Sequence, residues 1–266
     1  QNEPRVVSLL GHFLGIHAPG IKDLRTSLEV SHHLMLSHGK AVKLFREMNI
    51  NGQIGIAPNL SYHYPASQKP EDIAATELSF SIDARWYLDP LFKGSYPEDA
   101  LEHYKNKGIE LSFSQDDLKL ISQPMDFLAF NNYSSSFIKY DPTSESGYTG
   151  ADSIVENFEK TDMGWIVYPE GLYDLLMLLD RDYGKPNLII SENGAAFKDE
   201  ISSNGRIEDI KRTQYLKDYL TQAHRAIQDG VNLKGYYLWS FMDNFEWAYG
   251  YNKKFGIVHV DLETQE

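Results

Sequence analysis

Two glutamates are the residues of this chain whose type and position could do chemistry. Glu192 follows the apolar run at residues 187–190 and precedes an Asn-Gly turn signal, so it is predicted at the tip of a short buried strand. An acid in that position needs a partner, because an unpaired buried charge is costly. Glu3, in Asn2-Glu3-Pro4, is the candidate partner. Two facing carboxyl groups could act as acid/base and nucleophile on a glycosidic bond.

A third candidate is the aromatic stretch at residues 239–247, in which Trp239 and Trp247 flank the acid Glu246. Tryptophan faces can stack on a pyranose ring while a carboxylate accepts hydrogen bonds from neighbouring hydroxyl groups. A packed strand and loop would give the same pattern. The composition of 17 Tyr, 13 Phe and 4 Trp leaves the same two interpretations open, a large core or a sugar site.

Several other chemistries are disfavoured by the sequence. The net charge of −13 argues against nucleic acid or an anionic membrane surface as a partner, and no apolar run approaches the roughly 18 residues of a spanning helix. The chain has no Cys, no G-x-S-x-G and no nucleotide-binding glycine motif. His32, His33 and His38 lack the spacing and acidic companions of a metal site, so we expect no metal and no cofactor. Compartment and oligomeric state stay open, with a cytoplasmic location preferred.

The elements that must position these side chains alternate along the chain, which predicts one α/β domain with a parallel sheet. Several strands end in polar or aromatic residues, so the chemistry is expected at one rim of the sheet. That arrangement fits a (β/α)8 barrel, and it also fits the switch point of an open doubly wound sheet. Strands are predicted at 54–60, 126–133, 187–192 and 233–240, helices at 27–49, 70–88, 170–182 and 206–229, and a long loop at 141–164.

Neither end of the sequence resembles a domain boundary. The chain begins at Gln1 without Met or a signal-peptide pattern, and it stops directly after a strand-like segment at residues 256–260. We therefore expect residues 1–266 to be a single catalytic-domain fragment, truncated at both ends, of a longer protein.

A series of short motifs then runs through the chain. They are Asn2-Glu3-Pro4, residues 15–20 (GIHAPG), 32–41 (HHLMLSHGKA), 126–128 (DFL) with Asn131 and Tyr133, 161–165 (TDMGW), 168–172 (YPEGL), 191–194 (SENG), 239–247 (WSFMDNFEW) and 254–256 (KFG). Each motif alone is modest evidence, but their order and spacing are specific. Together they resemble glycoside hydrolase family 1, the β-glucosidase and β-galactosidase family, over essentially the whole chain.

The resemblance implies a TIM barrel, of which this chain would cover the end of strand 4 through strand 8. It implies a retaining β-glycosidase that removes terminal non-reducing β-D-glycosyl residues from a small β-glycoside or oligosaccharide. Two alternatives remain, an endo-glucanase type of barrel glycosidase and a non-catalytic sugar-binding homologue. The fragment on its own is expected to be inactive.

The resemblance also assigns roles to individual residues. Glu3 corresponds to the general acid/base at the end of strand 4, and Glu192 to the nucleophile at the end of strand 7. The remaining matches are substrate-binding: Asn2 for the sugar 2-hydroxyl, Asn131 as a further active-site amide, Tyr133 as a donor to the nucleophile, Trp165 on the aglycone side, and Trp239, Glu246, Trp247 and Phe255 around the glycone.

Overall fold

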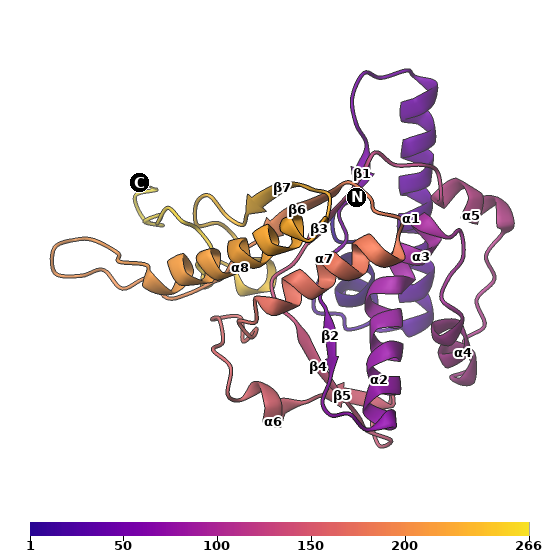
Figure 1. The fold of residues 1–266 in the computed structure, drawn as a ribbon, viewed down its shortest axis with the longest axis horizontal. Coiled ribbons are helices and arrows are strands. Elements are labelled where there is room, and N and C mark those ends of the chain that lie inside the picture. Colours follow the sequence, from indigo (N-terminus) through magenta and orange to yellow (C-terminus); the bar gives the residue numbers. More distant parts are fainter. Residues whose placement is uncertain (266) are drawn as a thin grey trace.

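The structure is a computed structural model that describes residues 1–265, so the last residue of the expected 1–266 fragment lies outside the described residues. Its centre is a sheet of four parallel strands in the order β1-β3-β6-β7 (Figure 1). The strands are β1 (Gly55–Ile56), β3 (Phe127–Asn131), β6 (Leu188–Asn193) and β7 (Leu233–Leu238).

Two long helices connect strands of this sheet and pack against each other: α7 (Glu170–Asp182) precedes β6, and α8 (Ile210–Gln228) lies between β6 and β7. The leucines of α7 recur at helical spacing and are fully buried in one core with the apolar residues of β3 and β6. Gly184 and Gly230 follow the two helices with φ of 76° and 100°, a left-handed conformation that glycine adopts without strain. Each helix therefore ends where the chain must turn back into the next strand.

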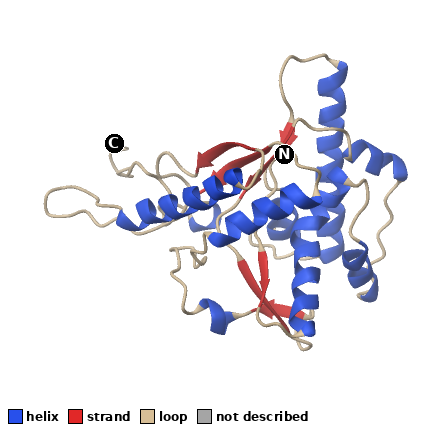
Figure 2. Cartoon of the chain, in the orientation of Figure 1, coloured by secondary structure: helices blue, strands red, loops and turns tan. Residues whose placement is uncertain are grey.

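A helical layer is built by the first half of the chain, and Figure 2 shows its helices gathered to one side of the sheet. Its longest member is α1 (Leu24–Glu47), which begins at Asp23, whose carboxylate accepts the Thr26 N–H at 2.7 Å. The other members are the π-helical turns η1 (Val6–Leu10) and η2 (Ser81–Arg85) and the helices α2 (Pro70–Phe80), α3 (Trp86–Phe92), α4 (Glu98–Asn106) and α5 (Gln115–Ile121).

A second, smaller sheet extends away from the first and packs on α2. In it β2 (His63–Pro65) pairs in parallel with β4 (Ser136–Tyr140), which pairs in antiparallel fashion with β5 (Tyr148–Gly150). The short elements α6 (Asp152–Val155) and η3 (Trp247–Tyr249) complete the described chain.

The alternation predicted from the sequence is confirmed in the central sheet and its helices, with bounds that differ by a few residues. The long loop predicted at 141–164 was wrong in part, because β5 and α6 lie within it. Pairing with β4 across a turn makes β5 a strand, although its three residues carry no apolar pattern of their own. The strand-like segment at 256–260 forms only a bridge between Val258 and Met242.

Within residues 1–265, β7 pairs only with β6, and β1 is extended on its outer side only by a bridge between Asn2 and Ala57. The central sheet is therefore open at both edges. No helix in the described part of the chain is long and apolar enough to cross a membrane.

Candidate active site

Parallel pairing brings the carboxyl ends of neighbouring strands to one edge of the central sheet. The register pairs Asn131, the last residue of β3, with Glu192 near the end of β6. Asn2 pairs with Ala57, directly after β1, and the Glu3 N–H donates to the Ala57 carbonyl at 2.7 Å. Segments that lie about 190 residues apart in the sequence thus meet, and the rim predicted from the polar strand ends exists.

The two glutamates are connected through a pair of amide side chains. Asn131 Nδ2 donates to Glu3 Oε1 and to Asn2 Oδ1, each at 3.0 Å. Asn2 Nδ2 in turn donates to Glu192 Oε1 at 3.5 Å. A single hydrogen-bonded chain therefore runs from one carboxyl group to the other.

Both oxygens of the Glu192 carboxylate accept hydrogen bonds. Asn2 reaches Oε1, and the Tyr133 hydroxyl donates to Oε2 at 2.5 Å. Burial and then the charge of Glu192 raise the pKa of the Tyr133 phenol, so the tyrosine keeps its proton and acts as the donor. The Glu192 carboxylate is therefore held in place by one donor on each of its oxygens.

The environment of Glu3 favours the protonated form of its carboxyl group. The pKa of its carboxyl group is raised to about 6, chiefly because burial disfavours the charged form. The hydrogen bond from Asn131 opposes this shift, while the charges of Glu192 and Glu246 add to it. A carboxyl group that keeps its proton up to about pH 6, placed beside a second carboxyl group, is an arrangement that acid/base chemistry can use.

Glu3 also has an unusual backbone conformation, with φ of 46°. This left-handed region is uncommon for a residue with a β-carbon. The N–H bond to Ala57 holds the backbone of Glu3 beside the end of β1. The sheet edge therefore fixes the direction in which the Glu3 side chain leaves the chain.

The predicted sugar-binding residues fall into two groups. Trp165 and Phe255 pack around Tyr133, with ring centroids 5.3 and 6.0 Å from the tyrosine ring. Phe255 is only 2% exposed, and its ring centroid lies 6.2 Å from that of Trp165, so the three rings contact one another. These three aromatic residues gather beside the Glu192 carboxylate that Tyr133 contacts.

The second group lies on the segment after β7. Trp239 is half-buried, and its backbone N–H donates to the Asn193 carbonyl at 3.0 Å. Burial and the charge of Glu192 raise the pKa of Glu246, so this third acid acts electrostatically on the same site. Trp247 is 65% exposed, and its ring stacks on His17 at 5.7 Å. The structure brings Glu246 near the pair, whereas the contact of Trp247 is with the segment after η1.

Sequence reasoning missed the residues that hold this site in place. The Ser191 hydroxyl bonds to Asn131 Oδ1 at 2.6 Å. Asn193 is fully buried, where its amide donates to the Asn132 carbonyl and to the Tyr215 hydroxyl. Ser191 and Asn193 flank Glu192 in the sequence, and that adjacency is the signal that could have found them. Tyr215 belongs to α8, and its helical spacing indicates only a core position.

Of the three helix histidines, His32 lies near a carboxylate, with its Nε2 3.7 Å from Asp117. Within residues 1–265, no cluster of three metal-ligand side chains includes any of these histidines. His32 bonds through Nδ1 to the Tyr96 hydroxyl at 3.0 Å. Burial lowers the pKa of His38 to about 4, which keeps its ring neutral. Both therefore serve as packed or hydrogen-bonded side chains of α1.

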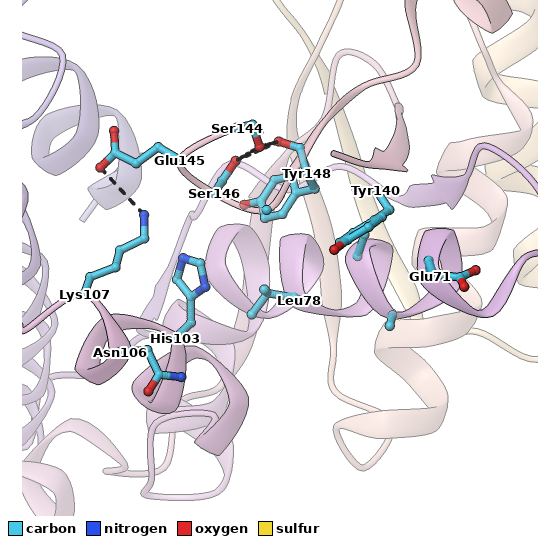
Figure 3. A pocket seen from close by; sticks show the side chains of 13 residues that line it. Glu71, Leu78, His103, Asn106, Lys107, Tyr140, Ser144, Glu145, Ser146 and Tyr148 are labelled. Atoms are coloured by element: carbon cyan, nitrogen blue, oxygen red, sulfur yellow. Dashed lines mark hydrogen bonds and ion pairs between the residues drawn. The ribbon is translucent and has the colours of Figure 1, made fainter. Parts of the chain in front are cut away.

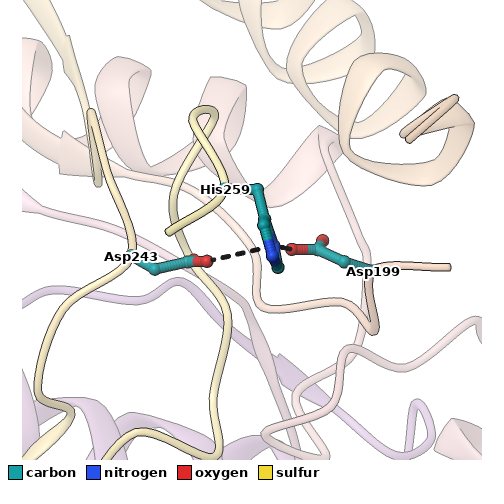
Figure 4. Close-up of side chains that lie close together, drawn as sticks. All are labelled: Asp199, Asp243 and His259. Carbon is teal, nitrogen blue, oxygen red and sulfur yellow. Dashed lines mark hydrogen bonds and ion pairs between the residues drawn. The ribbon is translucent and has the colours of Figure 1, made fainter. Parts of the chain in front are cut away.

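A different cluster has the ligand types of a metal site, and Figure 4 shows it: Asp199, Asp243 and His259. His259 Nδ1 lies 2.9 Å from Asp199 and 3.7 Å from Asp243. The two carboxylates also form ion pairs, Asp199 with Arg212 at 3.4 Å and Asp243 with Lys254 at 3.1 Å. Because each buried carboxylate already has a cationic partner, the arrangement fits a structural role. We call these five residues the ion-pair cluster.

A cavity of about 580 Å³ lies elsewhere, between α2, α4 and the β4–β5 hairpin (Figure 3). Its lining includes Leu78, His103, Tyr140 and Tyr148, and an ion pair between Lys107 and Glu145 spans 3.7 Å at one side. Neither Glu3 nor Glu192 lines it. The site residues predicted from the sequence therefore lie outside this cavity.

Comparisons with known proteins agree with the geometry. The chain is 82% identical over 266 residues to β-glucosidase A of Acetivibrio thermocellus, covering all of this chain and 59% of that enzyme. It is 35% identical over 278 residues to the 6-phospho-β-glucosidase GmuD of Bacillus subtilis, with 99% of this chain and 59% of that protein covered. The chain thus spans about three-fifths of the length of these relatives.

A solved structure extends the likeness to three dimensions. The β-glucosidase of Thermotoga maritima in complex with deoxynojirimycin superposes with a TM-score of 0.94 at 42% identity, covering 100% of this chain and 59% of that one. Such enzymes are (β/α)8 barrels, so the open sheet described above is part of a barrel, as the sequence predicted. The family model for glycosyl hydrolase family 1 matches residues 1–266. The chain belongs to glycosyl hydrolase family 1.

Proposed function

We propose that this chain supplies both catalytic carboxyl groups of a retaining β-glycosidase, within a single catalytic domain of which residues 1–266 are a part. The observation that carries the proposal is the contrast between the two acids. Glu192 has a donor on each oxygen, whereas the pKa of Glu3 is raised to about 6. One group suits a nucleophile and the other a proton donor.

In the first step, an oxygen of the ionised Glu192 attacks the anomeric carbon of the β-glycoside. The bond from that carbon to the leaving oxygen breaks, and the protonated Glu3 transfers its proton to that oxygen. The products are the free alcohol of the aglycone and a glycosyl ester of Glu192. Tyr133 and Asn2 position the Glu192 oxygens for this attack.

In the second step, water attacks the anomeric carbon of the ester from the face that the aglycone has left, and the bond from that carbon to the Glu192 oxygen breaks. Glu3, now ionised, takes a proton from the water while Glu192 is released as a carboxylate. Formation of the ester removes one of the charges that raise the pKa of Glu3, so Glu3 loses its proton more readily when it must act as the base. Two inversions at the anomeric carbon give net retention.

The remaining predicted residues would hold the sugar. Asn2 and Asn131 provide amides beside the acid pair. In this proposal Trp165 would lie toward the aglycone, and Trp239, Glu246, Trp247 and Phe255 would lie around the glycone. The presence of Glu246 favours a glycone without a phosphate group, because a carboxylate repels a phosphate group. A small β-glycoside also suits the net charge of −13 better than nucleic acid or an anionic membrane surface, and a cytoplasmic location is part of the same proposal.

The test uses a barrel hybrid, in which this chain is joined to the part of A. thermocellus β-glucosidase A that it does not span. The hybrid is expected to hydrolyse an aryl β-glucoside, and NMR is expected to detect β-glucose as the first product. Glu192→Gln should lower turnover on the order of 10⁴- to 10⁶-fold while the circular dichroism spectrum is unchanged. A folded hybrid without hydrolysis, or one whose first product is α-glucose, would contradict the proposal.

Azide distinguishes the roles of the two acids. In Glu192→Ala, azide can replace the carboxylate and attack the glycoside once, giving an α-glycosyl azide. In Glu3→Ala, azide attacks the ester of Glu192 and gives a β-glycosyl azide. The opposite products would reverse the assignment. A sugar-binding homologue would give neither product and would keep its affinity in both variants.

A further inference from the structure

We propose that Ser191 is a positioning residue that fixes the orientation of the Asn131 amide and thereby the protonation of Glu3. The inference rests on the proposed function only in taking Glu3 as the proton donor. Ser191 directly precedes Glu192 on β6, and its hydroxyl lies 2.6 Å from Asn131 Oδ1. Through Asn131 it is connected to Glu3 and Asn2.

The orientation of the Asn131 amide matters because its two ends are chemically opposite. The NH₂ group is a donor, and both atoms that it contacts, Glu3 Oε1 and Asn2 Oδ1, are oxygens. A rotated amide would turn its own oxygen toward those two oxygens. The Glu3 carboxyl would then lose the hydrogen bond that lowers its pKa.

Ser191 supplies a contact that selects one orientation. Asn131 is 1% exposed, so bulk water cannot orient its amide. The hydroxyl of Ser191 donates to Oδ1, which leaves the NH₂ group directed at Glu3 and Asn2. Because Asn2 Oδ1 receives that NH₂ group, the amino end of Asn2 is left to donate to Glu192. One hydroxyl therefore sets the direction of every donor between the two acids.

A matched pair of variants separates this role from simple packing. Ser191→Thr retains the hydroxyl, whereas Ser191→Val has nearly the same shape without it. In the barrel hybrid, we expect Val to shift the alkaline limb of the kcat/KM profile upward by about one pH unit, since one pKa unit corresponds to the loss of one moderate hydrogen bond. Thr is expected to restore the parental limb. Ser122→Ala, which removes a hydroxyl bonded to the Lys119 carbonyl, serves as a remote control.

A second measurement does not depend on turnover. ¹³C NMR of carboxyl-labelled glutamate can follow the titration of Glu3, with its signal assigned by its loss in Glu3→Gln. The expected result is a higher Glu3 pKa in the Val variant than in the Thr variant. Equal Glu3 pKa values in the two variants would overturn the role of Ser191. A parental hybrid that fails to hydrolyse β-glycosides would instead contradict the proposed function, and the NMR titration would still decide the role of Ser191.

Discussion

The chain contains two groups of buried or half-buried carboxylates, and they differ in how their charge is balanced. In the candidate active site, Glu3, Glu192 and Glu246 interact with one another and with amide and phenol donors. Among residues 1–265, no Lys or Arg forms an ion pair with any of the three. In the ion-pair cluster, Asp199 and Asp243 have Arg212 and Lys254 as partners.

Under the proposed function, the difference separates carboxylates that serve chemistry from carboxylates that serve stability. Burial is the main cause that raises the pKa of Glu3, and the uncompensated charges of Glu192 and Glu246 raise it further, so Glu3 holds a proton more readily. A cationic partner removes that effect and turns the same side chain into a structural link between distant segments. Sequence composition alone does not distinguish the two groups, since both are acids near aromatic residues.

The largest expected effect is on turnover. Glu3→Gln in the barrel hybrid removes the transferable proton and should lower kcat for a poor leaving group by about 10²- to 10⁴-fold. Asp199→Asn, which alters the ion-pair cluster in an equally isosteric way, should leave kcat nearly unchanged. Steady-state kinetics of both variants checks the contrast. Equal losses in the two variants would show that the distinction between the groups is wrong.

The next effect is on stability, and here the ion-pair cluster should be the more sensitive of the two groups of carboxylates. Asp243 is almost fully buried. Its carboxylate forms an ion pair with Lys254 and accepts hydrogen bonds from the backbone N–H groups of Gly256 and Val260. Asp243→Ala should therefore lower the free energy of unfolding by about 3 kcal/mol, because it leaves a charge and two N–H groups without their acceptor. Urea unfolding measures this. Asp116→Ala, at an exposed ion pair, is the control and should change stability by less than about 1 kcal/mol.

The pH dependence sharpens the comparison further. Glu3 must be protonated to act, so kcat/KM should fall as pH rises through the raised pKa of about 6, by about tenfold for each further pH unit. The leaving group of a 2,4-dinitrophenyl glycoside needs no proton. The kcat/KM profile for this substrate should therefore lack the alkaline fall. Rate profiles of the two substrates provide the measurement. If the kcat/KM profiles of both substrates fell in the same way at alkaline pH, Glu3 would not be the proton donor.

A smaller shift is expected from Glu246, whose charge is the last of the causes that raise the pKa of Glu3. Glu246→Gln should move the alkaline limb to lower pH by less than about one unit. Glu145→Gln, which removes the exposed partner of Lys107, is the charge-matched control and should not move it. An upward shift in Glu246→Gln would contradict the electrostatic coupling.

The smallest effect concerns divalent cations. Because Arg212 and Lys254 already balance Asp199 and Asp243, added calcium or zinc and added EDTA should leave the unfolding midpoint of the barrel hybrid unchanged. Thermal unfolding monitored by circular dichroism is sufficient. A saturable rise in the midpoint would assign the ion-pair cluster to metal binding.

Much of the fold could be predicted because its elements carry their own signals. The leucines of α7 recur at helical spacing, and β6 is an apolar run between a proline and a turn. The short strands of the second sheet carry no such signal. β2 and β5 have three residues each and exist because β4 offers backbone partners, a tertiary effect invisible in a local pattern.

The candidate site shows the same division. Glu192 could be found from its place at a strand tip, and the strand-end rule predicted where it would lie. The hydrogen bonds that connect Glu192 to Glu3 could not be predicted from the sequence, since they depend on the strand register that pairs Asn131 with Glu192. Ser191 and Tyr215 were missed for this reason, because their roles follow from geometry and not from residue type.

The left-handed backbone of Glu3 has a consequence for how such a protein would evolve under different selections. A β-carbon at φ of 46° is unfavourable by about 1–2 kcal/mol relative to an ordinary conformation, and glycine is free of this penalty. A library screened only for heat resistance should therefore enrich glycine at position 3, giving sturdier and catalytically silent proteins. With the proposed role of Glu3, a screen for turnover should instead keep glutamate at this position, in spite of its backbone penalty.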